Sequence, residues 1–131
     1  MIKFLDKDTI LYFHYDLITR YGGSRGVRDD NLQESALAQP QTTLNGKFLY
    51  NNIYEMASAY GYHLCKNHPF IDGNKRITLI AMYTFLYVNG YELNIGEKEM
   101  YLLIMGVANN SISKEELTDY IKKYTIKRNS G

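Results

Sequence analysis

Apolar side chains recur three and four positions apart through most of the chain, which is the spacing of one face of an α-helix. The first run of this kind predicts a helix that begins after a cap at Asp6 and ends near Tyr21, where two glycines follow. Asp29 is the expected cap of a short second helix over residues 31–38, which Pro40 ends. The pattern therefore predicts two helices joined by a glycine-containing loop.

The helical spacing is interrupted between residues 41 and 50. Here Asn45-Gly46, a strong turn signal, separates two short apolar patches and predicts a small hairpin or an extended flap. Helical spacing resumes after Asn51 or Asn52, either of which can cap a third helix that ends at about Lys66.

The second half of the chain contains a strongly apolar segment, residues 74–89, which predicts a central helix buried on most sides and stopped by Gly90. A fifth helix is expected over residues 97–108. Ser113 and Glu116 have the spacing of a capping box and open a sixth helix. The residues expected to face the core from this last helix are Leu117, Tyr120, Ile121 and Tyr124.

These elements predict one domain without a core strand. No stretch alternates regularly enough between apolar and polar residues, and there is no repeat, low-complexity tract or linker. The polar tail from about Lys127 is expected to fray. We therefore predict that residues 1–131 form a single compact all-α domain, a bundle of about six helices with a short flap before the third main helix.

The composition adds little to this architecture but excludes several kinds of protein. A chain of 131 residues with 45% hydrophobic and 22% charged residues is ordinary for a soluble globular domain. A formal net charge of +1 argues against direct nucleic-acid binding. The single Cys65 forms no internal disulfide and has no zinc-ligand spacing around it. With no signal-like N-terminus and no apolar run of membrane-spanning length, we expect a cytoplasmic protein that does not enter a membrane.

One segment, His68–Arg76, brings together a base, a carboxylate, a glycine, an amide and two cations. Its last residues occupy the N-terminus of the apolar helix, where free backbone N–H groups and the helix dipole attract anions. Lys75 and Arg76 stand in the first turn, although the dipole favours acidic residues there. A phosphate bound between them would remove this conflict. The segment therefore predicts a phosphate site with a base, His68, beside it.

Several of these residues have a structural alternative. His68 is the candidate general base, because histidine titrates near neutrality and can take a proton from a hydroxyl; the alternative is a capping or buried histidine. Asp72 is the candidate ligand of a Mg²⁺ ion that bridges nucleotide phosphates, or else the N-cap of the next helix. Phe70 is expected to anchor the segment to the core, and His14 and His63 are expected to be structural.

The remaining candidates are expected to contact phosphate. Gly73 supplies a tight turn and close approach to a ligand. Asn74, Lys75 and Arg76 are the contact candidates, with an exposed polar helix start as their alternative. Lys66, two residues before the histidine, adds a further cation or is simply a solvated lysine at a helix end.

The segment resembles the signature of the Fic/Doc superfamily, His-x-Phe-x-(Asp/Glu)-Gly-Asn-(Gly/Lys)-Arg, and the lysine at position 75 points to its Doc branch, the toxins of Doc–Phd toxin–antitoxin pairs. Residues 20–23, the Asn89-Gly90 stop and residues 111–124 are also similar, so that the resemblance covers nearly the whole chain. It implies a helical fold, a metal-binding role for Asp72, a basic residue at position 66, and a Phd-type antitoxin whose disordered tail folds onto the toxin.

Two departures from the Fic pattern bear on the reaction. Fic enzymes that transfer AMP carry a glycine in place of Lys75 and a second arginine in place of Leu79. Doc-type proteins share both departures, which implies a reversed nucleotide with its γ-phosphate toward the acceptor. The resemblance then implies Mg²⁺-dependent transfer of the γ-phosphate of ATP to a threonine of translation elongation factor Tu, halting translation. On this hypothesis the flap at residues 41–50 seats the target as an added strand.

Two alternatives remain. The first is AMP transfer to a protein hydroxyl by the same histidine, which releases pyrophosphate where phosphorylation releases ADP. The second is a partner-binding module with a degenerate site, because resemblance in fold does not establish activity. The intact motif residues argue against the second alternative.

Overall fold

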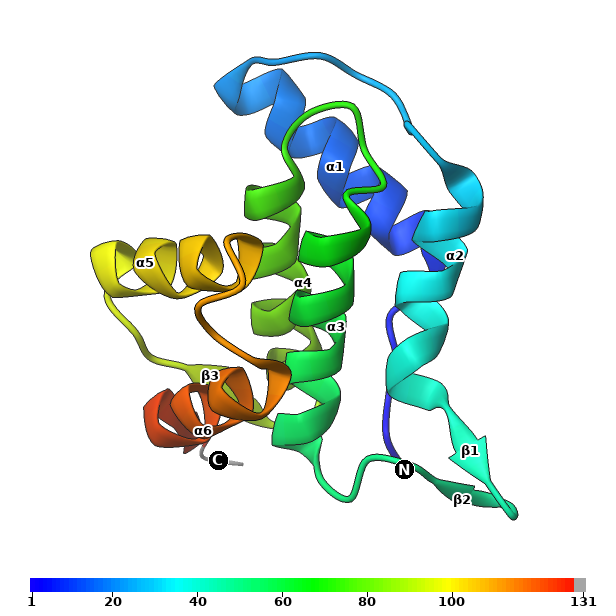
Figure 1. Cartoon of the computed structure of the whole chain (residues 1–131), viewed down its shortest axis with the longest axis vertical. Coiled ribbons are helices and arrows are strands. Elements are labelled where there is room, and N and C mark those ends of the chain that lie inside the picture. Colours follow the sequence, from blue (N-terminus) through cyan, green and yellow to red (C-terminus); the bar gives the residue numbers. More distant parts are fainter. Residues whose placement is uncertain (129–131) are drawn as a thin grey trace.

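The computed structural model describes residues 1–128 and contains, within them, six α-helices and two small antiparallel sheets (Figure 1). The helices are α1 (Lys7–Tyr21), α2 (Asp30–Ala38), α3 (Ile53–Asn67), α4 (Asn74–Val88), α5 (Glu97–Ala108) and α6 (Lys114–Tyr124), and a 3₁₀ turn (Gln39–Gln41) follows α2. The all-α prediction is confirmed, and each predicted helix lies close to its expected bounds.

Most of the helices begin where the sequence supplies a side-chain cap. The caps accept a hydrogen bond from a free backbone N–H and are Asp6, Asp29, Asn52 and Ser113, before α1, α2, α3 and α6. At α6, Glu116 completes the predicted capping box. Such a cap typically stabilises by about 1 kcal/mol. α4 and α5 differ, because they begin at glycines without a side-chain cap.

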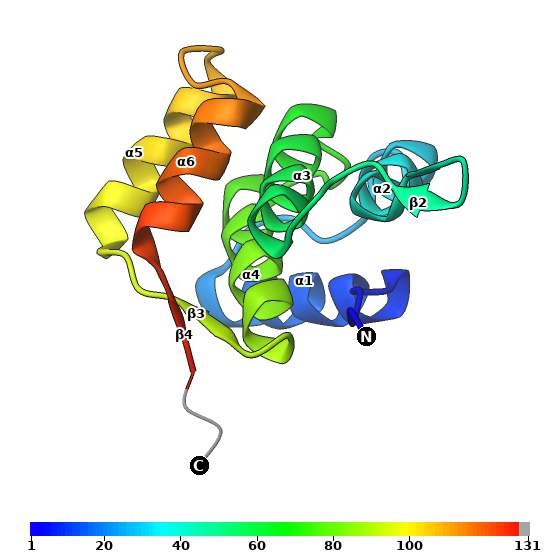
Figure 2. The same ribbon diagram turned by 90° about the horizontal axis from the view of Figure 1, so that it is seen from below.

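The core is built around α3 and α4, which pack together at the centre of the molecule (Figures 1 and 2). α1 and α2 lie on one side of this pair, and α5 and α6 lie on the other. Tyr60 of α3 and Ile77, Met82 and Phe85 of α4 are fully buried. The predicted central helix is therefore confirmed. Within residues 1–128, no helix is long and apolar enough to cross a membrane.

Gly61 allows α3 to pack directly on the Met82 side chain, since a Cβ at position 61 would overlap the thioether. We expect Gly61→Ala to lower the free energy of unfolding by about 1–3 kcal/mol, the usual cost of overpacking. Gly96→Ala is the matched control, because a Cβ there meets no atom within 4 Å. Urea denaturation measures both variants, and equal stabilities would contradict tight packing at Gly61.

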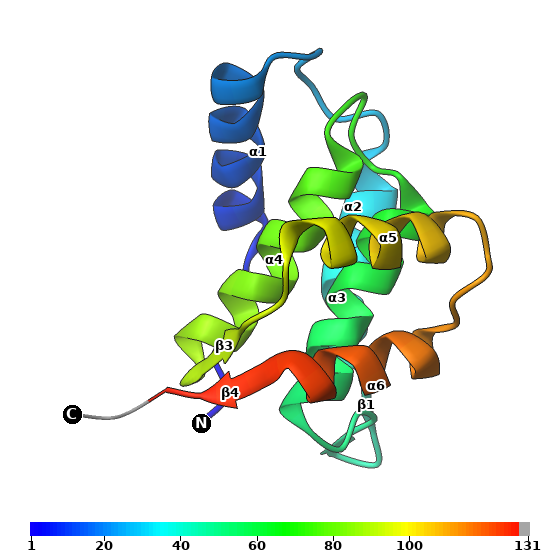
Figure 3. The ribbon, with the colours of Figure 1, turned by 90° about the vertical axis from the view of Figure 1, so that its left-hand side faces the viewer.

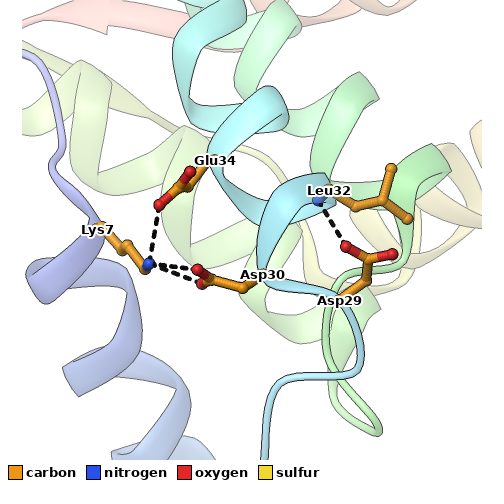
Figure 4. Close-up of polar contacts among 5 residues, drawn as sticks. All are labelled: Lys7, Asp29, Asp30, Leu32 and Glu34. Carbon is orange, nitrogen blue, oxygen red and sulfur yellow. Dashed lines mark hydrogen bonds and ion pairs between the residues drawn. The ribbon is translucent and has the colours of Figure 1, made fainter.

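The start of α2 is held against α1 by polar contacts (Figure 4). Asp29 accepts a hydrogen bond of 3.0 Å from the Leu32 backbone N–H. The Lys7 ammonium of α1 lies 2.7 Å from the Asp30 carboxylate and 3.1 Å from that of Glu34. Exposed ion pairs of this kind contribute little stability. Together with the Asp29 cap, these ion pairs place the start of α2 beside α1.

A hairpin precedes α3, as predicted. Strands β1 (Thr43–Leu44) and β2 (Lys47–Phe48) pair antiparallel, and Asn45 and Gly46 between them have φ values of 54° and 78°. Positive φ at both positions is what a two-residue type I′ turn requires.

The position of this hairpin limits how it could seat the target as an added strand, an expectation that stays a prediction. The hairpin lies at one end of α3 and the α3–α4 loop lies at the other (Figures 1 and 3). A 15-residue helix is a rod about 22 Å long. A target strand added to the hairpin would therefore lie about one helix length from the loop that carries the histidine, and another part of the target would have to reach His68.

The second sheet is not predicted by the sequence. Strand β3 (Tyr91–Leu93) pairs antiparallel with β4 (Thr125–Lys127), with Glu92 opposite Ile126. Each strand has three residues, too few for alternation to be recognised. The expectation that the tail frays from Lys127 is wrong at that residue, which is paired in β4; residues 129–131 lie outside the described part of the chain.

Both described ends of the chain are attached to the C-terminal end of α4. The Lys3 backbone N–H donates to the Asn89 side-chain oxygen (2.8 Å), and the Asn89 amide donates back to the Lys3 carbonyl (2.9 Å). The Arg128 backbone N–H donates to the Gly90 carbonyl (2.8 Å), and its guanidinium donates to the Tyr87 carbonyl (2.7 Å). The predicted stop at Asn89-Gly90 thus also anchors both ends.

α6 covers α3 with a narrower apolar face than predicted. Leu117 and Ile121 are buried, but Tyr120 is 40% exposed. Tyr120 lies at the edge of this face, where a tyrosine can pack its ring and keep its hydroxyl in water. Of the two positions open to Tyr120, core or rim, the structure shows the rim.

A lysine at the start of α6 joins this helix to α3 and to the hairpin segment. The Lys114 ammonium donates to the Tyr50 hydroxyl (2.8 Å) and lies 3.3 Å from Nε2 of His63. Burial, together with the nearby Lys114 charge, lowers the pKa of His63 to about 4. The histidine is therefore neutral in the folded protein at pH 7 and packs as a structural residue.

This pKa shift predicts a loss of stability in mild acid. The unfolded chain binds a proton at His63 near its ordinary pKa of 6.5, whereas the folded protein does so only near 4. Above pH 6.5, His63 is neutral in both states and does not weaken the fold. As the pH falls from 6.5 toward 4, the unfolded chain gains a proton that the folded protein does not, so the free energy of unfolding decreases. We expect the urea midpoint to fall between pH 7 and pH 5, and to fall less in His63→Gln. An identical pH dependence in the variant would contradict the assignment.

Candidate active site

The predicted motif forms the loop between the two central helices. α3 ends at Asn67, and His68 caps it in the left-handed conformation, with φ 50° and ψ 54°. Gly73, with φ 80°, then starts α4. A Cβ at Gly73 would lie 2.9 Å from Cδ1 of Leu17 on α1. Glycine is therefore required here both by its backbone conformation and by the close approach of α1.

Inside the loop, Phe70 and Asn74 hold each other in place. Phe70 is fully buried, as expected of an anchor. The Asn74 side-chain oxygen accepts from the Phe70 backbone N–H (3.0 Å), and its amide donates to the Phe70 carbonyl (2.9 Å). Asn74 is only 5% exposed. Its side chain, a candidate phosphate contact, is thus occupied within the loop, and only its backbone N–H remains for a ligand.

His14 supports the loop from α1. Its ring stacks on Phe70, with centroids 3.9 Å apart and an angle of 11° between the planes. Its Nε2–H donates a hydrogen bond of 2.7 Å to the Asp72 carbonyl. His14 is 5% exposed. The expectation of a structural histidine is confirmed.

The loop between α1 and α2 packs along the motif loop, a neighbour that the motif itself does not reveal. The Ile71 backbone N–H donates to the Gly26 carbonyl (3.1 Å), and the Arg28 N–H donates to the Pro69 carbonyl (2.7 Å). Val27 and Phe70 form an isolated antiparallel bridge between these contacts. Gly23, the second glycine after Tyr21, was the available signal, because a Cβ there would lie 2.6 Å from Oδ2 of Asp72.

Asp72 joins the two loops through its carboxylate, which accepts from the backbone N–H groups of Ser24 (3.1 Å) and Gly73 (2.9 Å). These hydrogen bonds lower the pKa of Asp72 below its ordinary value, so the group is a carboxylate at neutral pH. The cap position of α4 belongs to Gly73, without a side-chain cap hydrogen bond. The N-cap alternative for Asp72 is therefore wrong.

The Asp72 carboxylate is a possible ligand of Mg²⁺ only together with ligands from outside the protein. Within residues 1–128, no group of three or more His, Cys, Asp or Glu side chains is placed to hold a metal ion. Mg²⁺ is commonly bound by one or two carboxylates together with phosphate oxygens and waters. Asp72 thus fits a Mg²⁺ ion that arrives with a nucleotide, and not a site built by the protein alone.

The N-terminus of α4 is a concentrated positive site. It has no side-chain cap and no acidic residue in its first turn. In the described part of the chain, the backbone N–H groups of Asn74, Lys75 and Arg76 have no hydrogen-bond partner outside the helix. The Lys75 and Arg76 side chains are exposed, and the Arg76 guanidinium lies 4.1 Å from the centre of the Tyr21 ring. Donors, dipole and cations all favour an anion here.

These groups border one cleft of about 1210 Å³ between the end of α1, the motif loop, the start of α4 and α5. The cleft contains all of the predicted site residues, namely Lys66, His68, Asp72, Gly73, Asn74, Lys75 and Arg76. Its other wall is apolar and includes Leu79, Met100 and Ile104. A polar, positive end beside an apolar wall suits a ligand with a phosphate group and an apolar ring.

Two members of the cleft differ in how freely they reach a ligand. The His68 side chain is exposed at the edge of the cleft, so its imidazole is accessible to a protein substrate. The Lys66 ammonium donates to the Val107 carbonyl (3.2 Å) and contacts the Asn110 side-chain oxygen. Lys66 is therefore not a simple solvated lysine, since it ties α3 to the end of α5.

Comparison with known proteins agrees with this geometry. Residues 4–86 match the model of the Fic/DOC family. A protein named Toxin Doc from Mycolicibacterium smegmatis is 37% identical over 93 residues, which cover 71% of this chain and 69% of the relative. A protein named Protein kinase doc from Escherichia phage P1 is 25% identical over 122 residues, covering 93% and 95% of the two chains. The chain therefore belongs to the Fic/DOC family, within its Doc toxin branch.

Proposed function

We propose that this Doc-like toxin transfers the γ-phosphate of ATP to a threonine hydroxyl of translation elongation factor Tu and thereby halts translation. The observation that carries the proposal is an exposed imidazole, His68, beside the uncapped, doubly cationic N-terminus of α4. The name of the phage relative, a protein kinase, supports the same reaction class.

In the proposed reaction His68 acts as the general base. Its imidazole takes the proton of the threonine hydroxyl, whose oxygen forms a bond to the γ-phosphorus while the bond from that phosphorus to ADP breaks. The products are phosphothreonine and ADP, and the proton remains on His68 until solvent removes it. The exposed position of the side chain suits a base that must meet a hydroxyl on another protein.

The start of α4 would stabilise the charge on the phosphates. Phosphoryl transfer depends mainly on positioning and electrostatics. The free backbone N–H groups, Lys75 and Arg76 provide both at one end of the cleft. Asp72 would hold Mg²⁺, which when bound neutralises phosphate charge.

The side chains at positions 75 and 79 favour phosphorylation over AMP transfer. Lys75 places a cation and its bulk at the phosphate end of the cleft, and Leu79 gives the cleft wall an apolar group with no charge for a further phosphate. The base and the anion site would serve either reaction, so the products of the reaction must decide between them.

The test is the intact mass of elongation factor Tu after incubation with this protein, ATP and Mg²⁺. We expect a gain of one phosphate and release of ADP, both abolished by EDTA. The matched control is His63→Gln, which changes a histidine outside the cleft and should remain active. A gain of AMP with release of pyrophosphate would replace phosphorylation by AMP transfer. No modification together with no ATP binding by calorimetry would favour a partner-binding module.

A toxin of this branch has an antitoxin partner, and we propose that it is of the Phd type. A Phd-type antitoxin whose tail covers the cleft should suppress the transfer in the same assay when added in molar excess. Undiminished transfer in a stable complex of the two proteins would overturn inhibition at this site.

A further inference from the structure

Arg28, which lies outside the motif, makes two hydrogen bonds to the turn that carries His68. Its Nε donates to the His68 carbonyl (2.7 Å), and its Nη2 donates to the Asn67 carbonyl (2.8 Å). These carbonyls stand at the C-terminal end of α3, where the helix leaves carbonyls unsatisfied and its dipole is negative. One planar guanidinium thus satisfies two consecutive carbonyls, a geometry that a lysine ammonium cannot reproduce.

The turn that Arg28 holds is conformationally unfavourable. His68 has φ 50° and ψ 54°, in the left-handed region that crowds the Cβ of any residue other than glycine. Such a conformation persists only where its surroundings impose it, and it is typical of functional sites. The Arg28 contact to the His68 carbonyl holds the peptide plane that follows the Cα, and with it the direction of the Cα–Cβ bond from which the imidazole extends.

The guanidinium is itself presented from a fixed backbone. The Arg28 N–H donates to the Pro69 carbonyl, and so does the N–H of Asp29 (3.1 Å). Asp29 caps α2, whose first turn is bound to Lys7 of α1 (Figure 4). Among the described residues, no carboxylate forms an ion pair with Arg28 that would draw it away. The contact therefore links the start of α2 to the end of α3.

We propose that Arg28 is a positioning residue for His68, and that it keeps the imidazole directed to the cleft for proton removal. The inference rests on the proposed function for the role of the histidine as base. It goes beyond that function by assigning part of the catalytic geometry to the loop between α1 and α2. The alternative is a purely structural contact that supports the fold without affecting the imidazole.

Kinetics of Arg28 variants test the proposal in the transfer assay. We expect Arg28→Ala to lower kcat by about 10–100-fold, because small displacements of a reacting group are costly. The KM for ATP should stay within about twofold, since Arg28 does not border the cleft. Arg28→Lys should recover only a small part of the loss. Arg25→Ala is the matched control and should keep full activity, because among the described residues the polar and ring contacts of this neighbouring arginine are with Thr19 and Tyr15 of α1.

Two further measurements separate positioning from folding. Thermal unfolding of Arg28→Ala shows whether the protein is intact at the assay temperature. In a His68→Ala background, the additional Arg28→Ala change should cause no further loss of the residual rate. An equal further loss there, or an unchanged kcat in a folded Arg28→Ala protein, would overturn the proposal.

Imidazole NMR makes the test independent of catalysis. The chain has three histidines, so His68 can be assigned from its absence in His68→Ala. In Arg28→Ala we expect the His68 signals to shift or broaden, while those of His14 and His63 stay in place. Unchanged His68 signals would overturn the positioning role. If wild-type protein transfers no group to any target, the proposed function fails, and the NMR result still decides whether Arg28 fixes the imidazole.

Discussion

Replacing His68 with alanine is expected to lower the rate of phosphate transfer by about two to four orders of magnitude, the usual contribution of a general base. Neither of the other two histidines can replace it, because His14 is buried and donates to the Asp72 carbonyl, and His63 does not border the cleft. The fold should be retained because the side chain is exposed, although alanine suits the left-handed backbone at this position less well than histidine does.

The measurement is the initial rate of phosphate incorporation into the target, with urea denaturation of each variant as the check on folding. His68→Asn is the better second variant, because asparagine tolerates left-handed backbone yet cannot act as a base. ATP affinity should be nearly unchanged in both variants, since the phosphate-binding groups remain. A folded variant that keeps more than about a tenth of the wild-type rate would exclude His68 as the base.

Replacing Phe70 with alanine is expected to lower the free energy of unfolding by about 3–5 kcal/mol. The ring is fully buried and stacks on His14, so its removal leaves a cavity beneath the motif loop. Within residues 1–128, the hydrogen bonds of the Asn74 side chain go to the Phe70 backbone, inside the loop itself, so they do not tie the loop to another element. We therefore expect the loop to loosen before the rest of the protein unfolds.

Ile71→Ala is the matched control for this prediction, because the adjacent side chain is 53% exposed. Ile71→Ala should lower the free energy of unfolding by well under half as much as Phe70→Ala does, as measured by urea denaturation at pH 7. Hydrogen exchange of the loop amides should accelerate in Phe70→Ala at a urea concentration where α3 and α4 remain protected. A cost below about 1 kcal/mol for Phe70→Ala would mean that the anchor lies elsewhere.

The helices and the core of the site could be predicted because their determinants are local. Caps such as Asp6 and Ser113 act on backbone groups two or three residues away. The motif is contiguous, so its residues share one turn and one helix start however the rest of the chain folds. Lys66 borders the same cleft as the motif because it lies in the last turn of the helix that leads directly into the motif.

What could not be predicted depends on contacts between distant segments. Arg28 is 40 residues from His68, and nothing in its local sequence indicates its partner. The inward direction of the Asn74 side chain follows from the closure of the loop, which residue type alone does not reveal. The distance of the hairpin from the motif loop could have been inferred. The hairpin precedes α3 and the motif loop follows it, so the length of this 15-residue helix separates them.

The attachment of both chain ends to the far end of α4 determines how the protein can be handled. Lys3 and Arg128 bind next to each other at residues 87–90, whereas the cleft is at the start of the same helix. A fusion partner or surface tether placed before residue 3 or after residue 128 should leave the cleft accessible. A short linker joining the two ends should permit a circular permutant that opens at the Asn45-Gly46 turn. Such fusions would let a toxin be displayed on a surface in one orientation, with its cleft facing its target.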